Sequence, residues 1–269
     1  MALEISHLVV NGCSFTYCQG LYDPPTEGWP RLLADKLGVP VVNLAAPGSS
    51  NDGIHRRTYD YFYKNLSNNS KPFYIMAMSQ NTRREEYVIY RDHKMLQDYT
   101  NISSNDRETL SKEIFKNMDD KGIALMEFQK LMKWRSLINL FEAHNVPFVT
   151  SDYFPNFTEG TFVQDYIKKN YLALYMSIHT HPNTLKCFTQ ITRPYPKALD
   201  NGHDGKEAQV VLADYIYNQI IKRYKEIKPV DSEFLSLKNF KTQNFPQFED
   251  QNRWYRYEMG LPKKYGLDE

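Results

Sequence analysis

The 269-residue chain has almost no net charge and few cysteines. Its 33 Lys and Arg balance 32 Asp and Glu to a net charge of +1, so no field of the whole molecule attracts nucleic acid or an acidic membrane surface. The three cysteines, Cys13, Cys18 and Cys187, are odd in number and form no Cys-x-x-Cys pair. They therefore predict neither a disulfide framework nor a thiolate zinc site.

Long apolar runs and glycine-rich loops are also missing. No stretch approaches the ~20 apolar residues of a membrane span, and the N-terminus has neither the basic start nor the apolar length of a signal peptide. We therefore expect a soluble, cytoplasmic protein that meets no membrane. The absence of a Gly-x-Gly-x-x-Gly or P-loop sequence argues against a flavodoxin-like nucleotide binder.

The chain does contain short apolar segments that alternate with helical patterns, which predicts an α/β fold with a mostly parallel sheet. Pro30 near the start of the first helix and Gly38 at its end are typical boundary residues. The predicted strands are residues 7–12, 41–45, 73–78 and 146–151. The predicted helices are residues 28–38, 51–66, 123–144 and 205–224.

Two regions depart from this alternation. Residues 85–121 are polar and weakly periodic, and we interpret them as an insertion that is either a lid or a passive excursion. Residues 226–269 have little apolar periodicity but carry scattered aromatic side chains. We expect this C-terminal extension to wrap the domain or to meet a partner, and it is the candidate surface for a homo-oligomer. Residues 1–225 would form the main domain.

The leading functional candidate is Ser14, which directly follows the first predicted strand. The carboxyl edge of a parallel sheet is where α/β folds bind their ligands. Gly12 permits a tight turn there, and the neighbouring Cys13 is an alternative nucleophile. Adjacent residues of an extended segment point opposite ways, so only one of the two faces the crevice. We expect Cys13 to pack inward as a small apolar side chain.

Polar residues follow the other predicted strands as well. Gly48 and Ser49 come after the second strand, and Asn81 comes after the third. Asp200 and His203 lie just before the last predicted helix. The sequence therefore predicts a cluster of polar groups at the carboxyl edge of the sheet.

In order and placement these blocks resemble those of the SGNH, or GDSL-like, hydrolases, a flavodoxin-like α/β/α group of esterases and lipases that act on acyl, acetyl or related esters. The resemblance spans residues 7–224 and implies a three-layer fold. Cysteine stands where the family's first block, G-D-S, has aspartate. The matching segments are Gly12-Cys13-Ser14, Gly48, Ser79-Gln80-Asn81-Thr82 for G-x-N-D, and Asp200-Asn201-Gly202-His203 for the closing D-x-x-H.

The resemblance implies a serine esterase with a catalytic triad and an acyl-enzyme intermediate. Ser14 would be the nucleophile, His203 its general base, and Asp200 the group that orients the imidazole. The backbone N–H groups of Ser14 and Gly48 and the side-chain amide of Asn81 would form the oxyanion hole. Such a mechanism needs no metal and no organic cofactor.

The expected substrate is a short acyl or acetyl ester of a carbohydrate or another small molecule, and no nucleic acid is expected as a partner. Arg83, close to Asn81 in the sequence, is a candidate to bind an anionic or sugar group of that substrate, with a solvated surface charge as the alternative. A catalytically silent binding or structural module on the same scaffold stays open. The reason is that Cys13, Ser79 and Thr82 depart from the family's blocks.

Several acidic and amide residues near these blocks are expected to cap helices. Asp204 competes with Asp200 for the role of triad acid, but Asp204 with Glu207 three residues later is typical of a helix N-cap and N3 pair. Asn51 or Asp52 is expected to cap the second predicted helix.

His179 and His181 form a His-x-His sequence. Such a pair chelates zinc only when a third ligand converges on it. No carboxylate or cysteine has a suggestive spacing, so a polar loop without a metal is the preferred interpretation.

Overall fold

The structure, a computed structural model, describes residues 2–66, 70–80, 83–88, 98–103, 120–154 and 162–230. The chain divides into two compact units, Met1–Ser232 and Glu233–Glu269, and all of the described residues belong to the first. The candidate insertion is described only in part, and most of the C-terminal extension, with its role in a homo-oligomer, lies outside the described residues.

A four-stranded parallel sheet in the order β3-β2-β4-β7 forms the centre of the first unit. All four strands predicted from the sequence are present in it. The direction of strand addition reverses between β2 and β4, so the carboxyl ends of these two strands form the topological switch point at which such sheets bind ligands. The strands are β2 (His7–Asn11), β3 (Val41–Asn43), β4 (Pro72–Met78) and β7 (Phe148–Asp152).

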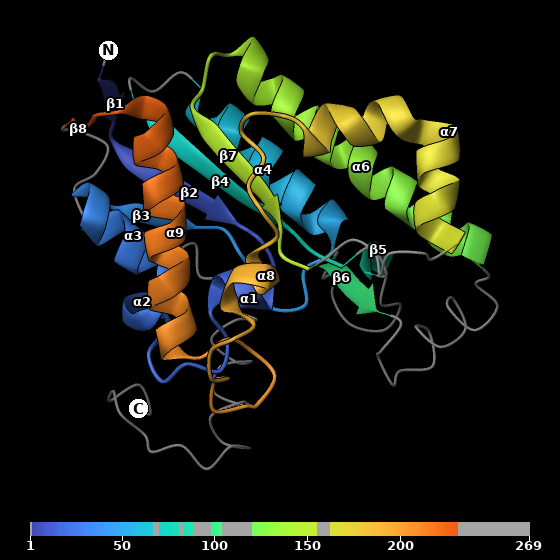
Figure 1. The fold of residues 1–269 in the computed structure, drawn as a ribbon, viewed down its shortest axis with the longest axis horizontal. Helices are drawn as coiled ribbons and strands as arrows, with labels where there is room; N and C mark the ends of the chain where they lie inside the picture. Colours follow the sequence, from blue (N-terminus) through green and yellow to red (C-terminus); the bar gives the residue numbers. More distant parts are fainter. Residues whose placement is uncertain are drawn as a thin grey trace. The chain divides into compact units, whose positions relative to one another are not determined.

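Helices cover both faces of the sheet, which confirms the predicted three-layer α/β/α architecture (Figure 1). One face packs against α3 and α9, and the other packs against α4, α6 and α7. The predicted helices are all present, whereas α7 has no counterpart among the predictions. The bounds are α3 (Trp29–Leu37), α4 (Asn51–Asn65), α6 (Asp120–Ala143), α7 (Phe162–His179) and α9 (Lys206–Tyr224).

The strands supply apolar side chains to both layers, because successive side chains point to opposite faces. In β4, Phe73 and Ile75 join the core beneath α3 and α9, while Tyr74 and Met76 join the core beneath α4 and α6. A strand that is buried on both faces has an almost continuous apolar sequence, which is the pattern of the predicted strand at residues 73–78.

The ends of α3 agree with the sequence prediction, whereas the N-caps of α4 and α9 differ from it. In α3, Pro30 lies in the first turn and Gly38 ends the helix with a φ of +67°. The cap of α4 is Ser50, whose side chain accepts a hydrogen bond from the Gly53 N–H at 3.2 Å, so the predicted cap at Asn51 or Asp52 is wrong. The N-cap of α9 is Gly205.

Two small sheets accompany the central one. β1 (Leu3–Ile5) pairs in parallel with β8 (Ile227–Pro229), which follows α9. β5 (Arg83–Val88), which begins two residues before the candidate insertion, pairs in antiparallel with β6 (Asp98–Ser103) inside it. Within the described ranges, no helix combines the length and the apolar character needed to cross a membrane.

Candidate active site

Ser14 begins the short helix α1 (Ser14–Tyr17) directly after β2, at the switch point of the sheet. The preceding Cys13 is the N-cap of α1 and is fully buried, as predicted. Gly12 has no room for a side chain, because a Cβ there would lie 2.2 Å from Oγ1 of Thr16. The Ser14 N–H, at the first position of a helix, has no acceptor inside that helix. It is therefore suited to meet a developing negative charge.

Asp200 and His203 form the pair that the sequence predicted. Asp200 Oδ2 lies 2.5 Å from Nδ1 of His203, and Asp200 Oδ1 accepts hydrogen bonds from the backbone N–H groups of Gly202 and His203 at 3.0 Å each. Burial acts to raise the pKa of Asp200, but these hydrogen bonds favour the carboxylate more strongly and lower it. A carboxylate that receives the Nδ1 proton leaves Nε2 of His203 available as a base.

Phe15 connects the segment that begins with Ser14, the serine segment, to the loop that carries Asp200 and His203, the histidine loop. Its ring centroid lies 4.5 Å from that of His203, so the residue after Ser14 packs directly on the imidazole. Ser14 itself is 4 % exposed. Among the residues that the structure describes, no hydrogen bond joins the Ser14 hydroxyl to His203.

Gly20 brings the same two segments together at a second point. Its carbonyl accepts a hydrogen bond from the Leu199 N–H at 3.2 Å. Gly20 has a φ of +86°, and a Cβ there would lie 2.8 Å from the carboxylate of Asp200. Only glycine therefore fits both the backbone conformation and the space at this position.

Asp204 holds the histidine loop in place instead of capping α9, which corrects the prediction. The residue is 1 % exposed, and its carboxylate accepts hydrogen bonds from the Tyr153 hydroxyl at 2.8 Å and from Lys197 Nζ at 2.9 Å. The Tyr153 ring also packs on Phe15, with centroids 4.9 Å apart. Tyr153 thus contacts the neighbour of Ser14 on one side and the neighbour of His203 on the other.

Gly48, the second expected oxyanion donor, lies in the loop between β3 and α4 with a φ of +72°. Its N–H donates no hydrogen bond to any residue that the structure describes. The Ala46 N–H donates to the Gly12 carbonyl at 3.3 Å, which ties this loop to the serine segment. Arg57 of α4 fixes the loop from outside by donating to the Leu44 carbonyl at 2.9 Å.

Asn81, the third expected donor, lies outside the described residues, so its role stays a prediction. The residues before it are fixed by Asn51, for which the sequence predicts only a role as a helix cap. Asn51 Oδ1 accepts from the Ser79 N–H at 2.8 Å, and Asn51 Nδ2 donates to the carbonyls of Ser79 and Gln80 at 3.1 and 3.2 Å. The start of α4 is thereby bound to the chain that leaves β4.

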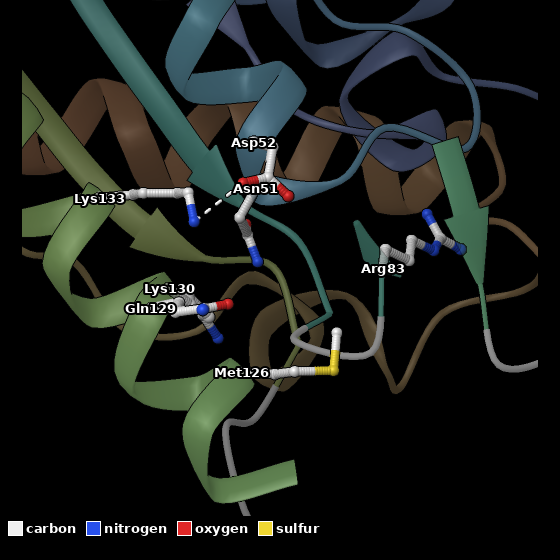
Figure 2. A pocket seen from close by; sticks show the side chains of 7 residues that line it. All are labelled: Asn51, Asp52, Arg83, Met126, Gln129, Lys130 and Lys133. Atoms are coloured by element: carbon white, nitrogen blue, oxygen red, sulfur yellow. Dashed lines mark ion pairs between the residues drawn. The ribbon is translucent and has the colours of Figure 1, made fainter. Parts of the chain in front are cut away.

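Arg83 lies at the start of β5, shortly after β4 ends, and lines a pocket with residues of α4 and α6 (Figure 2). The pocket has an empty volume of about 230 Å³ and opens to solvent. Its other lining residues are Asn51, Asp52, Met126, Gln129, Lys130 and Lys133.

A buried charged cluster lies behind this pocket. Lys130 Nζ is 2.7 Å from Asp152 Oδ2 and 3.8 Å from Glu127 Oε1. Burial raises the pKa of Asp152 to about 7, with Glu127 raising it further and Lys130 opposing the rise. No sequence signal distinguished these three residues from ordinary surface charges of a helix and a strand end.

The two histidines of the His-x-His sequence have separate surroundings. His181 Nε2 lies 2.9 Å from Glu142 Oε1, whereas the His179 ring packs on Trp134 with centroids 5.5 Å apart. His179 is the last residue of α7, which corrects its assignment to a loop. Within the described part of the chain, no group of three or more His, Cys, Asp or Glu side chains is placed to hold a metal ion.

The fold and the site together define an α/β/α protein with a serine and an Asp–His pair at the carboxyl edge of its sheet. The solved structures similar to this chain include esterases and also proteins described as members of the lipolytic G-D-S-L family or as GDSL-like lipases. The psychrotrophic esterase EstA from Pseudoalteromonas sp. is 15 % identical with a TM-score of 0.47, covering 82 % of this chain and 100 % of that one.

Two further structures show similar values. A carbohydrate acetylesterase family member from Sinorhizobium meliloti is 12 % identical with a TM-score of 0.45, covering 82 % of this chain and 100 % of that one. A member of the lipolytic G-D-S-L family from Veillonella parvula is 10 % identical with a TM-score of 0.45, covering 81 % and 99 %. No protein-family model and no curated protein matches the sequence.

Proposed function

We propose that the protein is a serine esterase that hydrolyses a short acyl or acetyl ester of a carbohydrate or another small molecule. The observation that carries the proposal is the Asp200–His203 pair, whose loop packs on the segment that begins with Ser14. A carboxylate on Nδ1, an available Nε2 and a nearby hydroxyl are the parts that acyl transfer to serine requires.

In the proposed reaction, Ser14 Oγ attacks the ester carbonyl carbon while His203 Nε2 takes the hydroxyl proton. The tetrahedral intermediate collapses, the alcohol leaves with the proton from His203, and the acyl group stays on Ser14. Water then attacks the acyl-enzyme with His203 again as the base, and the carboxylic acid is released. Asp200 keeps the imidazole in one tautomer and stabilises the imidazolium form in both halves.

The oxyanion of each intermediate would be stabilised by backbone donors. The Ser14 N–H has no acceptor within α1, and the Gly48 N–H donates to no described residue, so both are available for this role. Asn81 is proposed as the third donor on the family resemblance.

Hydrolysis of p-nitrophenyl acetate by the wild type and by Ser14→Ala tests the proposal. We expect Ser14→Ala to lower kcat/KM by roughly 10³-fold or more, as the loss of a triad member does. Cys13→Ala is the matched control, because Cys13 is buried next to the proposed nucleophile, and we expect it to retain activity. Equal hydrolysis by wild type and folded Ser14→Ala would remove Ser14 from the mechanism.

One observation favours a second candidate, a catalytically silent binding module on the same fold. Ser14 is nearly buried and, in the part of the chain described, makes no hydrogen bond with His203. A serine hydroxyl that shares no hydrogen bond with a base is a weak nucleophile, which is why this geometry favours the binding module.

A fluorophosphonate probe separates the two candidates without a known substrate. An activated Ser14 Oγ would form a bond to phosphorus and release fluoride, which intact-protein mass spectrometry detects as a mass increase. The esterase proposal expects modification of the wild type and none of Ser14→Ala. An unmodified wild type under conditions that label a known serine esterase would favour the binding module.

A further inference from the structure

Tyr153, the residue that follows β7, contacts both of the segments that carry the reacting groups of the proposed esterase. Its ring packs on Phe15, the neighbour of Ser14, with centroids 4.9 Å apart. Its hydroxyl donates a hydrogen bond of 2.8 Å to Oδ2 of Asp204, the neighbour of His203. The two segments are far apart in the chain, so contacts of this kind decide how the reacting groups are placed relative to each other.

The backbone of Tyr153 is anchored to the central sheet and to a neighbouring helix. Its N–H donates to the Met78 carbonyl at the end of β4 at 2.8 Å, and its carbonyl accepts from the Thr189 N–H of α8 (Phe188–Thr192) at 3.0 Å. Its ring packs edge to face on Phe188, with centroids 5.6 Å apart. A large side chain held in this way in a close-packed interior has little freedom to move. Tyr153 is therefore a fixed support for the two segments that contact it.

The hydrogen bond from Tyr153 reaches the histidine loop at a buried charge. Asp204 is 1 % exposed, and its other carboxylate oxygen accepts from Lys197 Nζ at 2.9 Å. Removing a donor from a buried carboxylate is costly, so Asp204 stays where both donors reach it. Because His203 directly precedes Asp204 in the chain, a displacement of Asp204 would also displace the imidazole.

The ring of Tyr153 reaches the imidazole by a second route, through Phe15. The Phe15 ring packs on Tyr153 and on His203, and aromatic pairs at such distances attract each other in defined arrangements. Tyr153 itself is 0 % exposed and therefore cannot touch a substrate. Its influence on a reaction must pass through Phe15 and Asp204.

We propose that Tyr153 is a positioning residue, which sets the place of the His203 imidazole relative to the Ser14 hydroxyl. The inference rests on the proposed esterase function for the roles of these two groups as base and nucleophile. A displacement of ~1 Å between reacting groups can cost about 100-fold in rate. The hydroxyl of Tyr153 therefore contributes to kcat although it never meets the substrate.

Kinetics of p-nitrophenyl acetate hydrolysis by Tyr153→Phe test the inference. The variant keeps the aromatic ring and loses only the hydroxyl that binds Asp204. We expect kcat to fall by about 10-fold and KM to stay within about twofold, because His203 acts in both halves of the reaction and no contact with substrate is lost. The matched control is Tyr61→Phe, which removes a hydrogen bond between a tyrosine hydroxyl and His7 at the start of β2 and should keep the wild-type kcat.

A second variant reaches the same carboxylate from the surface. Lys197→Gln removes the other hydrogen bond to Asp204, and the Lys197 side chain is 41 % exposed. We expect a smaller loss of kcat, by about 2- to 5-fold, because partly exposed ion pairs contribute little. A wild-type kcat in folded Tyr153→Phe would overturn the inference. Should Tyr153→Phe not fold, a wild-type kcat in Lys197→Gln would overturn it.

The imidazole NMR resonances of His203 separate this inference from the proposed function, because they need no reaction. The imidazole lies on the Phe15 ring, so a displacement changes the ring-current shift of its Cε1 and Cδ2 protons. We expect both resonances, assigned with His203→Gln, to move in Tyr153→Phe and to stay in place in Tyr61→Phe.

Two outcomes distinguish the failure of one proposal from the failure of the other. Moved His203 resonances in a protein without Ser14-dependent hydrolysis would support the positioning contact and contradict the esterase. Unmoved resonances and an unchanged kcat of Tyr153→Phe, in a protein with Ser14-dependent hydrolysis, would support the esterase and contradict the positioning role.

Discussion

Acid should destabilise the fold through His7, which begins β2 beneath α4. The side chain is 1 % exposed, and its ring nitrogens hydrogen-bond with the Ser6 hydroxyl at 2.8 Å and the Tyr61 hydroxyl at 3.2 Å. Burial lowers the pKa of His7 from 6.5 to about 4. Between those two values the unfolded chain binds a proton that the folded chain excludes, so stability falls as the pH falls.

The size of the effect follows from the two pKa values. On going from about pH 7 to about pH 5, His7 should lower the free energy of unfolding by about 2 kcal/mol. Asp152 acts in the opposite direction, because its pKa is raised to about 7 by burial and the folded state therefore binds a proton that the unfolded state has released. The wild type alone would show only the difference between such effects, so the contribution of His7 must be isolated by substitution.

Urea unfolding of the wild type and of His7→Gln at both pH values isolates the contribution of His7, because Asp152 is present in both proteins. We expect the loss on acidification to be about 2 kcal/mol smaller in His7→Gln, whatever the stability of that variant at neutral pH. His144→Gln is the control, because His144 is exposed, and it should follow the wild type. An equal acid response in the wild type and His7→Gln would refute the assignment of a neutral, buried His7.

Three further substitutions test the contacts around the candidate site. Tyr153→Phe removes a hydrogen bond to the buried carboxylate of Asp204 and should lower the free energy of unfolding in urea by about 1.5–3 kcal/mol. An unchanged free energy of unfolding would show that this hydrogen bond does not stabilise Asp204. Gly20→Ala places a Cβ against the carboxylate of Asp200 at a residue with positive φ, so the esterase kcat should fall by roughly 10-fold. A wild-type kcat would show that the loop with Asp200 accommodates the added methyl group. Asn51→Ala removes three hydrogen bonds, two of them buried, and should lower the free energy of unfolding in urea by about 3 kcal/mol. A loss below about 1 kcal/mol would assign Asn51 no structural role.

The elements that could be predicted from the sequence are those with a regular pattern. Apolar runs located the four central strands, and the turn residues Pro30 and Gly38 located α3. The helix α7 was not predicted, because Tyr171, with φ −135° and ψ 31°, interrupts the helix and its apolar periodicity. β1 and β8 are three residues each and far apart in the chain, so neither shows a pattern of its own.

In the candidate site, the contact within Asp-x-x-His could be predicted because both side chains lie on one loop, three residues apart. The roles of Asn51 and Asp204 could not be predicted. Each precedes or starts a helix and belongs to a residue type that caps helices, but the three-dimensional position of a distant partner decides its use. For Asn51 that partner is the chain after β4, and for Asp204 it is Tyr153.

The pairing of β1 with β8 bears on how the first unit could be produced as a separate fragment. A fragment that ends with α9, where the apolar pattern of the sequence stops, would lack the strand that hydrogen-bonds to β1 and would expose the edge of β1 to solvent and to other molecules. A longer fragment that ends after Val230, whose N–H donates to the Ile5 carbonyl at 2.9 Å, keeps this closure intact.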